Sequence, residues 1–443
     1  MSNWQKVKIG DFLFERKGRY KPNDEQIVNL PRIEKIDFSG NFHIGNKDSK
    51  TDMILIKDGD LVISGINVAK GAIGIYSGED VTATIHYSSY TFDSNKINVE
   101  YFKRFLKSSE FIELLNEQVK GGIKTEIKPK HILPLEIQLP DINTQAQIVQ
   151  HFENVEDDIA DVTKEVLKQE SLLKKLKQTI LQEAIEGKLT AKWRAKNPDI
   201  GTAKELLDQI KTEKEQLVKD KKIKASKLLA PINEDEIPFD IPPSWEWCKF
   251  GEIIYENPRN GYSPKTVDYK TEIKTLKLGA ITQGYFDTTQ IKYLDISIEK
   301  DSFLWLKKGD VLIQRSNSLE HVGMAGIYNL KDTNYIYPDL IMKCQVVQPV
   351  INYFIHKYLV SNFTREYFRN NASGAQQSMP KINQGTVTNL LVPLPPTEEQ
   401  KEIVATIEKL FTICDELEGE INQNKTTVDN LMATVLKEAF EQQ

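Results

Sequence analysis

The sequence predicts an α+β protein in which one unit, a mixed α/β domain followed by a long helix, occurs twice in 443 residues. Three observations predict this fold class. Short sequence anchors recur in the same order in both halves of the chain. Each half contains β-branched runs bounded by Gly-Asp turns. Each half then ends in apolar residues with a coiled-coil period. We therefore expect two mixed α/β domains separated by a long antiparallel two-helix coiled coil, with a pseudo-twofold internal repeat.

The repeat is defined by anchors at both ends of the unit. WQKVKIGD at Trp4 aligns with WEWCKFGE at Trp245, and KDGDLVISG at Lys57 aligns with KKGDVLIQR at Lys307. Residues 135–188 align without a gap with residues 390–443, with 14 identities in 54 positions. The same order at both ends indicates an internal duplication.

Composition separates a domain from a helix in each unit. Residues 1–140 and 241–395 carry the short β-rich runs, and their charges nearly balance. The predicted spacer helices, residues 141–190 and 396–443, are acidic: residues 141–188 hold 6 Lys/Arg and 10 Asp/Glu, and residues 396–443 hold 4 and 11. Residues 191–240 form a charged helical linker that ends in the proline-rich extended segment IPFDIPPSW.

The two spacer helices carry a predicted coiled-coil seam. Its apolar positions are spaced alternately four and three residues apart, which gives the 3.5-residue period of a coiled coil. One column consists of Ile148, Val155, Val162, Gln169, Leu176, Ile403, Leu410, Leu417, Asn424 and Leu431. The alternate column consists of Phe152, Ile159, Val166, Leu173, Ile180, Ile407, Cys414, Ile421, Val428 and Val435. Gln169 and Asn424 interrupt the seam at equivalent positions, where a polar residue either fixes the register or lies in a solvated gap.

Each predicted helix begins at a recognisable signal. Thr397 and Gln400 form a capping-box pattern after Leu-Pro-Pro. The first copy has no threonine there, so we expect Asp141 or Asn143 to cap that helix. Thr202 and Glu205 form another capping box, which opens the linker helix.

Composition also limits the class of protein. The chain is 40% hydrophobic and 28% charged, as in globular proteins. No apolar run approaches the ~18 residues of a membrane span, and MSNWQKVKIG does not resemble a signal peptide. Cys248, Cys344 and Cys414 lie far apart, with no CxxC spacing. We therefore expect a cytoplasmic protein that binds neither membrane nor structural zinc.

Motifs for catalysis are missing from the sequence. There is no GxxxxGK[ST], no GxGxxG after a strand, and no Asn/Asp-Pro-Pro-Tyr/Phe run of the kind an amino-methyltransferase uses. Asp199 and Asp220-Lys221-Lys222 match a nuclease spacing only formally, because the second element lies in a charged predicted helix. The 6 histidines lack metal-ligand spacing. We expect no catalytic residue, metal or cofactor in this chain.

Polar, aromatic and basic residues gather in the predicted loops of both domains. Arg, Asn and Gln side chains read base edges, whereas Lys, Ser and glycine N–H groups mostly hold phosphates. Surface loops favour these residue types anyway, so the paired loops Ser64–Asn67 and Gln314–Asn317, which follow equivalent strands, carry more weight. The candidate DNA-binding residues are Lys17, Arg19, Tyr20, Ser64, Asn67, Lys70, Lys120, Lys124, Arg259, Asn260, Tyr262, Gln314, Arg315, Asn317, Gln376, Gln377 and Lys381.

The order of these segments resembles the specificity subunit of a type I restriction–modification system. The resemblance covers essentially the whole chain and is carried by VPLPPTEEQKEIV, by GKLTAKWR…NP…AKELLDQI and by IPFDIPPSWEW. LPDINTQAQIV departs from the usual proline-rich, acidic form. The resemblance implies that each domain is a target recognition domain, and that the spacer helices separate the domains and dock modification subunits.

The resemblance further implies a non-catalytic protein that reads an asymmetric bipartite site in double-stranded DNA, for phage defence. Two modification (methyltransferase) subunits with S-adenosylmethionine would methylate an adenine in each half, and a restriction subunit would join through them. Half-sites read from one face would lie about 10 bp apart. Two alternatives stay open: a recognition subunit of a related methylation or defence system without a nuclease, and a coiled-coil scaffold that binds no DNA.

Overall fold

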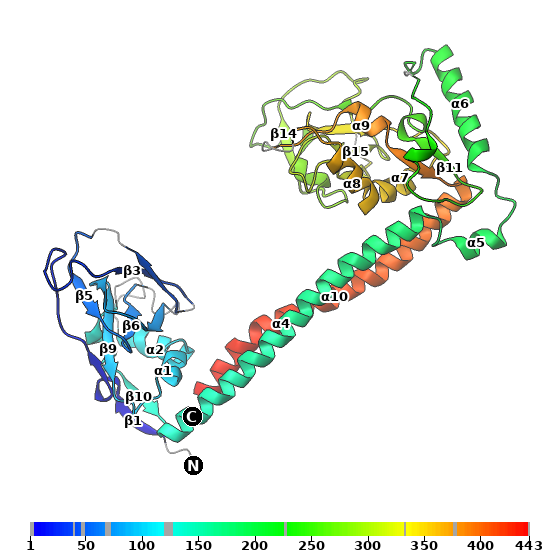
Figure 1. Cartoon of the computed structure of the whole chain (residues 1–443). Helices are drawn as coiled ribbons and strands as arrows, with labels where there is room; N and C mark the ends of the chain where they lie inside the picture. The colour runs from blue at the N-terminus through cyan, green and yellow to red at the C-terminus, as the bar shows by residue number, and fades with distance from the viewer. Residues whose placement is uncertain are drawn as a thin grey trace. The chain divides into compact units, whose positions relative to one another are not determined.

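The computed structural model describes residues 4–38, 40–45, 49–66, 72–118, 127–225, 228–331, 334–374 and 379–441. The chain divides into two compact units: unit 1 comprises Met1–Lys168 and Ile421–Gln443, and unit 2 comprises Gln169–Glu420. Each unit contains one mixed α/β domain and parts of both long helices (Figure 1). The mixed α/β class agrees with the prediction from sequence.

The described part of unit 1 forms a two-stranded sheet of order β1-β10 and two four-stranded sheets of order β2-β9-β6-β7 and β4-β3-β8-β5. The strands are β1 (Gln5–Lys8), β2 (Leu13–Glu15), β3 (Arg32–Ile36), β4 (Phe42–Gly45), β5 (Met53–Ile56), β6 (Leu61–Ser64), β7 (Ile73–Ile75), β8 (Val81–Thr84), β9 (Tyr87–Phe92) and β10 (Glu136–Leu139). The helices are α1 (Val99–Phe105), α2 (Ser109–Gln118), α3 (Pro129–Ile132) and the first part of α4 (Ile142–Ile185).

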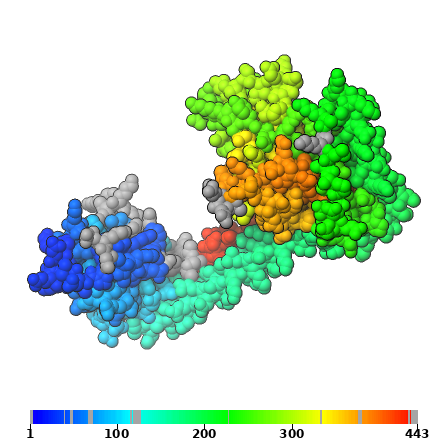
Figure 2. Space-filling model, turned by 45° about the horizontal axis from the view of Figure 1, so that its top comes forward, coloured from blue at the N-terminus to red at the C-terminus, as the bar shows by residue number. Residues whose placement is uncertain are grey.

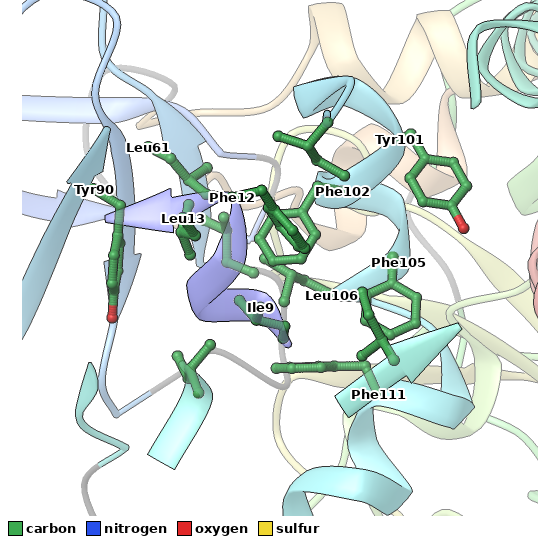
Figure 3. Packing of buried hydrophobic residues seen from close by; sticks show 14 of the residues in the cluster. Ile9, Phe12, Leu13, Leu61, Tyr90, Tyr101, Phe102, Phe105, Leu106 and Phe111 are labelled. Atoms are coloured by element: carbon green, nitrogen blue, oxygen red, sulfur yellow. The ribbon is translucent and has the colours of Figure 1, made fainter. Parts of the chain in front are cut away.

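An aromatic core fixes the helices of unit 1 to its sheets. Phe12 meets Phe102 edge-on with ring centroids 5.4 Å apart, and Phe105 meets Phe111 at 5.7 Å (Figure 3). All four side chains are at most 1% exposed. Because burying one such ring stabilises the fold by roughly 1.5–3 kcal/mol, α1 and α2 are held firmly on this core. Val435 of α10 (Thr397–Glu441) packs against the same cluster, which places the end of the C-terminal helix in the unit of the N-terminal domain.

Unit 2 repeats the two-stranded sheet and one four-stranded sheet of unit 1, and its third sheet has three described strands instead of four. Its sheets have the orders β11-β19, β12-β18-β15-β16 and β14-β13-β17. The strands are β11 (Glu246–Lys249), β12 (Arg259–Asn260), β13 (Ile273–Leu276), β14 (Ile291–Leu294), β15 (Val311–Gln314), β16 (Ala325–Ile327), β17 (Tyr335–Ile336), β18 (Ile341–Cys344) and β19 (Leu391–Leu394). The helices are α5 (Ala191–Lys196), α6 (Ala203–Lys219), α7 (Asn352–Leu359), α8 (Asn362–Asn370) and α9 (Gln384–Thr388), with parts of α4 and α10.

Equivalent hydrogen bonds occur inside the two domains. In unit 1 the Gly59 N–H donates to the Tyr76 carbonyl, and in unit 2 the Gly309 N–H donates to the Tyr328 carbonyl. Both glycines have a positive φ, of 79° and 95°, which the Gly-Asp turn before each central strand requires. The sequence anchors KDGDLVISG and KKGDVLIQR therefore fold into the same strand–turn arrangement.

Both spacer segments contain one long helix, and the start of the second helix differs from the prediction. α4 has 44 residues and α10 has 45. Asp141 accepts the N–H groups of Asn143 and Thr144 at 3.0 Å, so Asp141 caps α4. The Thr397–Gln400 capping box is wrong: Thr397 is already the first helical residue, and the Gln400 side chain is engaged elsewhere.

Inside unit 2 the end of α4 runs antiparallel to the start of α10 (Figure 1). The Lys177 ammonium donates to Asp415 at 2.9 Å and to Glu418 at 2.8 Å. Further along, Thr190 and Arg194, which follow α4, bind Glu399 in the first turn of α10. The order of these contacts reverses between the two helices, which defines the antiparallel direction.

The two columns of the predicted seam differ in burial. The alternate column is the more deeply buried one, with Phe152, Val166, Leu173, Ile180, Ile407, Cys414 and Ile421 at most 8% exposed. In the other column Ile403 is buried, whereas Val162, Leu176, Leu417 and Leu431 are 40–47% exposed. Gln169 is half-buried and Asn424 is exposed. Since the apolar stripe is wider than one helix–helix contact covers, part of it faces away from the partner helix.

The charged linker packs on the domain of unit 2. Thr202 and Glu205 form the predicted capping box at the start of α6, with bonds of 2.9 and 3.3 Å. The Lys214 ammonium donates to the carbonyls of Gly251 and Glu252, and the green surface of the linker borders the rest of the unit in Figure 2. Across the described residues, no helix is long and apolar enough to cross a membrane, and no cluster of metal-binding side chains occurs.

Candidate nucleic-acid interface

In unit 2 several predicted DNA-binding residues meet at one end of the sheet β12-β18-β15-β16. β12 ends at Asn260, β15 ends at Gln314 and β18 begins at Ile341, and these ends are neighbours because β18 pairs with both other strands. The Tyr262 N–H donates to the Tyr337 carbonyl at 2.9 Å, which keeps the next turn at the same end. The fold thus gathers residues that are far apart in sequence.

The loop that follows β15 is the centre of this cluster. The Arg315 N–H donates to Leu340, and the Ile382 N–H donates to the Arg315 carbonyl, at 2.8 and 2.9 Å. Ser316 forms a bridge with Lys381. Tyr262 and Lys381 are exposed, while Asn260, Arg315 and Asn317 are half-buried. Side chains able to contact bases and phosphates therefore lie on one continuous edge.

Three predicted residues have other surroundings. Gln314 is fully buried, and its amide binds Leu278 and Thr282, so it offers no free edge to a ligand. Ser64 is also buried, at 6% exposure. Arg259 pairs with Glu256 at 2.8 Å and lies over the ring of Phe303, beside a surface cavity of about 210 Å³.

Unit 1 presents the counterpart sheet β2-β9-β6-β7. Ser64 at the end of β6 pairs with Tyr87, and the Ile127 N–H donates to the Gly65 carbonyl, as Ile382 does to Arg315 in unit 2. Lys17 and Arg19 are exposed on the segment after β2, and Tyr20 is half-buried. Asn67, Lys70, Lys120, Lys124, Gln376 and Gln377 lie outside the described residues.

A buried aspartate supports each central strand. Asp60, 1% exposed, binds the Arg16 guanidinium through two bonds of 2.6 Å, and the hydrogen bond to Asp60 raises the pKa of Arg16. Its equivalent Asp310, 2% exposed, lies 3.5 Å from Lys343 and accepts from Gln345. Burial lowers the pKa of Lys343, and Asp310 opposes that effect. Charge-assisted bonds to Asp60 and Asp310 therefore hold the two strands in place.

The joints between domain and helix contain a glutamine pair that sequence reasoning did not assign. Gln145 and Gln400 are both 0% exposed. Gln145 accepts the Asn98 N–H at 2.7 Å, and Gln400 accepts the Ile351 N–H at 2.8 Å. Each amide also donates to the proline carbonyl five residues earlier, at 2.8 and 2.9 Å. The identical glutamine in LPDINTQ and LPPTEEQ was the signal that could have revealed this joint.

Glu399 forms a second buried anchor, which occurs in unit 2 alone among the described joints. Its carboxylate is 0% exposed and accepts hydrogen bonds from Thr190, Arg194 and the indole of Trp245, at 2.7, 2.9 and 2.9 Å. The equivalent residue in the first copy is Thr144, which bonds only to its helix cap Asp141. Glu399 thus ties the segment after α4 and the start of the second domain to α10.

Comparisons with known proteins assign this architecture. Residues 242–424 match the family model described as the type I restriction modification DNA specificity domain. A chain solved in work on complex assembly and conformational transition of the type I R-M system has a TM-score of 0.66 at 16% identity, covering 99% of this chain and 97% of that chain. That likeness establishes the fold. The chain therefore has the fold of that solved protein, and its residues 242–424 carry the matched specificity domain.

Two curated relatives make the assignment more specific. The type I restriction enzyme EcoEI specificity subunit of Escherichia coli is 31% identical over 269 residues, which are 58% of this chain and 43% of that subunit. The EcoAI specificity subunit of Escherichia coli is 27% identical over 469 residues, which are 91% of this chain and 77% of that subunit. Residues 242–424 thus match a type I DNA specificity domain, and the chain is similar to type I restriction enzyme specificity subunits over 58% and 91% of its length. The EcoEI match spans less than half the length of that relative.

Proposed function

We propose that this chain is a non-catalytic specificity subunit that recognises an asymmetric bipartite site in double-stranded DNA and directs methylation by partner subunits. Residues 1–140 and 241–395 are its two target recognition domains. The observation that carries this proposal is the edge of polar loops at the end of sheet β12-β18-β15-β16, on a strand order that recurs in β2-β9-β6-β7. Because the equivalent loops differ in sequence, the two domains read different half-sites.

The predicted DNA-binding residues of the two domains have distinct roles in the proposal. Asn260, Arg315 and Asn317 contact base edges, for which their amide and guanidinium groups are suited. Lys17, Arg19 and Lys381 contact phosphates, together with Lys70, Lys120 and Lys124. The aromatic Tyr20 and Tyr262, and the amides of Asn67, Gln376 and Gln377, complete the two surfaces.

The spacer helices, residues 141–190 and 396–443, form the antiparallel two-helix ruler that fixes the distance between the domains, about 10 bp between half-sites. Residues 191–240 connect the ruler to the second domain. We assign the docking of two modification subunits to the helices, which expose Leu172 and Leu176 beside lysines and Ile413 and Leu417 beside acidic residues. A restriction subunit joins through them. S-adenosylmethionine belongs to the modification subunits, and the complex acts in the cytoplasm.

Methylation mapping tests the recognition role. Genomic DNA is sequenced for methylated adenine with and without this gene, in a host that expresses the modification subunits. We expect one bipartite motif to lose methylation when the gene is removed. An unchanged methylation pattern contradicts the proposal.

Equal insertions test the ruler. Adding four residues after Gln169 and four after Asn424 extends both helices by about 6 Å. We expect unchanged half-sites with a longer spacer. A change in the bases of either half-site contradicts the ruler, whereas a changed spacer alone supports it.

A further inference from the structure

The segment between β15 and β16 in the second domain is anchored from three sides. The Gln314 N–H donates to Met324 and the Gly323 N–H donates to the Gln314 carbonyl, both at 2.8 Å, so the two ends of the loop are joined. Ser316, 0% exposed, donates to the Pro380 carbonyl. Arg365 of α8 donates to the Glu320 carbonyl at 2.7 Å. A loop with this many buried anchors holds one conformation before any ligand arrives.

Gly323 shows how closely the loop is seated. It has a φ of +76°, and a Cβ at this position would lie 2.4 Å from the ring of Phe368. No L-residue fits there without displacing α8. The exposed tip of the loop, Ser318–Glu320, is therefore carried on a rigid base.

The buried Gln314 amide has only one possible orientation. Its Nε2 donates to the Leu278 carbonyl and to Thr282 Oγ1, each at 2.8 Å. The Thr282 hydroxyl itself donates to the Leu278 carbonyl at 3.1 Å, so it has no proton left for Gln314. A carbonyl and a committed hydroxyl both require a donor, and the Gln314 oxygen must therefore point the other way.

That oxygen determines the orientation of Asn317. Asn317 Nδ2 donates to Gln314 Oε1 at 2.9 Å, and Asn317 Oδ1 accepts the Ser318 N–H at 2.8 Å. These bonds use one N–H and one lone pair of the Asn317 amide. The remaining N–H and lone pair form a donor–acceptor pair, which is the complement of the N6 and N7 positions of adenine in the major groove.

We propose that Gln314 is a specificity-positioning residue: through the polarity of its buried amide it orients Asn317 to read an adenine in the half-site of the second domain. Hydrogen bonds to Leu278 and Thr282 fix the positions of the N–H₂ group and the oxygen of the Gln314 amide. The Gln314 oxygen in turn fixes the positions of the N–H₂ group and the oxygen of the Asn317 amide. Gln314 touches no base. This inference rests on the proposed function, because it assumes that the loop contacts DNA.

The test compares three variants of the full-length chain in a host with the modification subunits. Asn317→Ala removes the reader, Gln314→Glu keeps the shape but cannot donate to Leu278, and Gln314→Met removes the polarity. The methylated motif of each strain is mapped by sequencing. The purified complexes also select from a duplex library in which both half-sites are randomised.

We expect all three variants to lose preference for adenine at the same single position, by roughly 5- to 150-fold, with the other bases of both half-sites unchanged. Methylation that still requires the other bases of both half-sites shows that each variant folds. Two results overturn the inference: an unchanged motif in both Gln314 variants, or a uniform loss of methylation in both while Asn317→Ala leaves the motif intact. If the unaltered chain selects no motif, the proposed function itself fails, and that outcome is separate.

Discussion

Replacing Glu399 by alanine should release the segment that connects the first helix to the second domain. The Glu399 carboxylate is the shared acceptor of Thr190, Arg194 and Trp245. In Glu399→Ala the Trp245 indole, in a residue only 4% exposed, and the hydroxyl of Thr190, in a residue 2% exposed, lose this acceptor. Removing one partner of a buried, hydrogen-bonded ion pair costs about 3–5 kcal/mol. Because the Arg194 side chain is 21% exposed and water can solvate it, we take the lower end, about 3 kcal/mol.

Hydrogen exchange of the full-length chain measures this loss where it occurs. A change of about 3 kcal/mol corresponds to roughly 150-fold faster opening. The peptide that contains Arg194 and the peptide that contains Trp245 should both show it, because their N–H groups donate to Thr190 and Pro242. Glu399→Gln should have a smaller effect, since its amide keeps one acceptor oxygen but turns an N–H₂ group toward a donor.

Thr144→Ala provides the matched control at the equivalent position of the first copy. Its hydroxyl bonds only to Asp141 on an exposed surface, so exchange should rise less than about tenfold and only at the start of α4. Exchange in Glu399→Ala within twofold of the unaltered chain around Arg194 and Trp245 would refute the view that Glu399 holds these segments together.

Three further predictions follow from buried polar groups. Gln145→Ala and Gln400→Ala should each destabilise their own joint by about 1–3 kcal/mol, measured as faster hydrogen exchange of α1 and α7 respectively; equal effects on both helices in either variant would contradict a local joint. Arg365 is 3% exposed, burial lowers its pKa to about 10, and its Nε and Nη1 have no partner among the described residues. Replacing this buried charge in Arg365→Met should therefore raise the melting temperature of unit 2 by about 2–4 °C. A lower melting temperature would show that the hydrogen bond to Glu320 contributes more than burial of the charge costs. Burial lowers the pKa of His356 from 6.5 to about 4, so the unfolded chain binds the extra proton and stability falls as pH drops from 6.5 toward 4. Between pH 7 and 5 the free energy of unfolding of the unaltered chain, measured with urea, should fall by about 2 kcal/mol more than that of His356→Gln. Parallel pH profiles of the two chains would contradict this.

The features that sequence predicted well are those set by local or periodic patterns. Helices of 44 and 45 residues follow from a sustained apolar period. The Asp141 cap and the Thr202–Glu205 box depend on neighbouring residues only, and both occur in the structure. The strand orders that match, β1-β10 with β11-β19 and β2-β9-β6-β7 with β12-β18-β15-β16, follow from the duplication, because equivalent sequences fold into equivalent sheets.

The features that sequence missed depend on residues far away in the chain. Gln314 follows a strand and is polar, which indicates a surface loop, yet its acceptor Leu278 lies 36 residues earlier and draws the amide into the interior. Gln400 fits a capping box locally, but Ile351, 49 residues earlier, supplies a buried N–H for its side chain. A heptad pattern likewise identifies an apolar stripe without stating how many helices will cover it, and Leu176 and Leu417 stay exposed for that reason.

The two joints between domain and helix are alike, whereas the loops after the central strands differ. Gln145 and Gln400 make the same two bonds at the two joints, so each helix leaves its domain in the same local geometry. The loop positions behave in the opposite way: Ser64 and Gln314 end equivalent strands but are different residues, and Gln314 binds the amide of Asn317. A substitution at the loop can therefore alter which base is read while the joint keeps the helix direction. The joints and helices should then determine the spacing between half-sites, and the loops should determine the bases. We therefore expect variants of Gln314 to change one base of the motif and insertions after Gln169 to change its spacer.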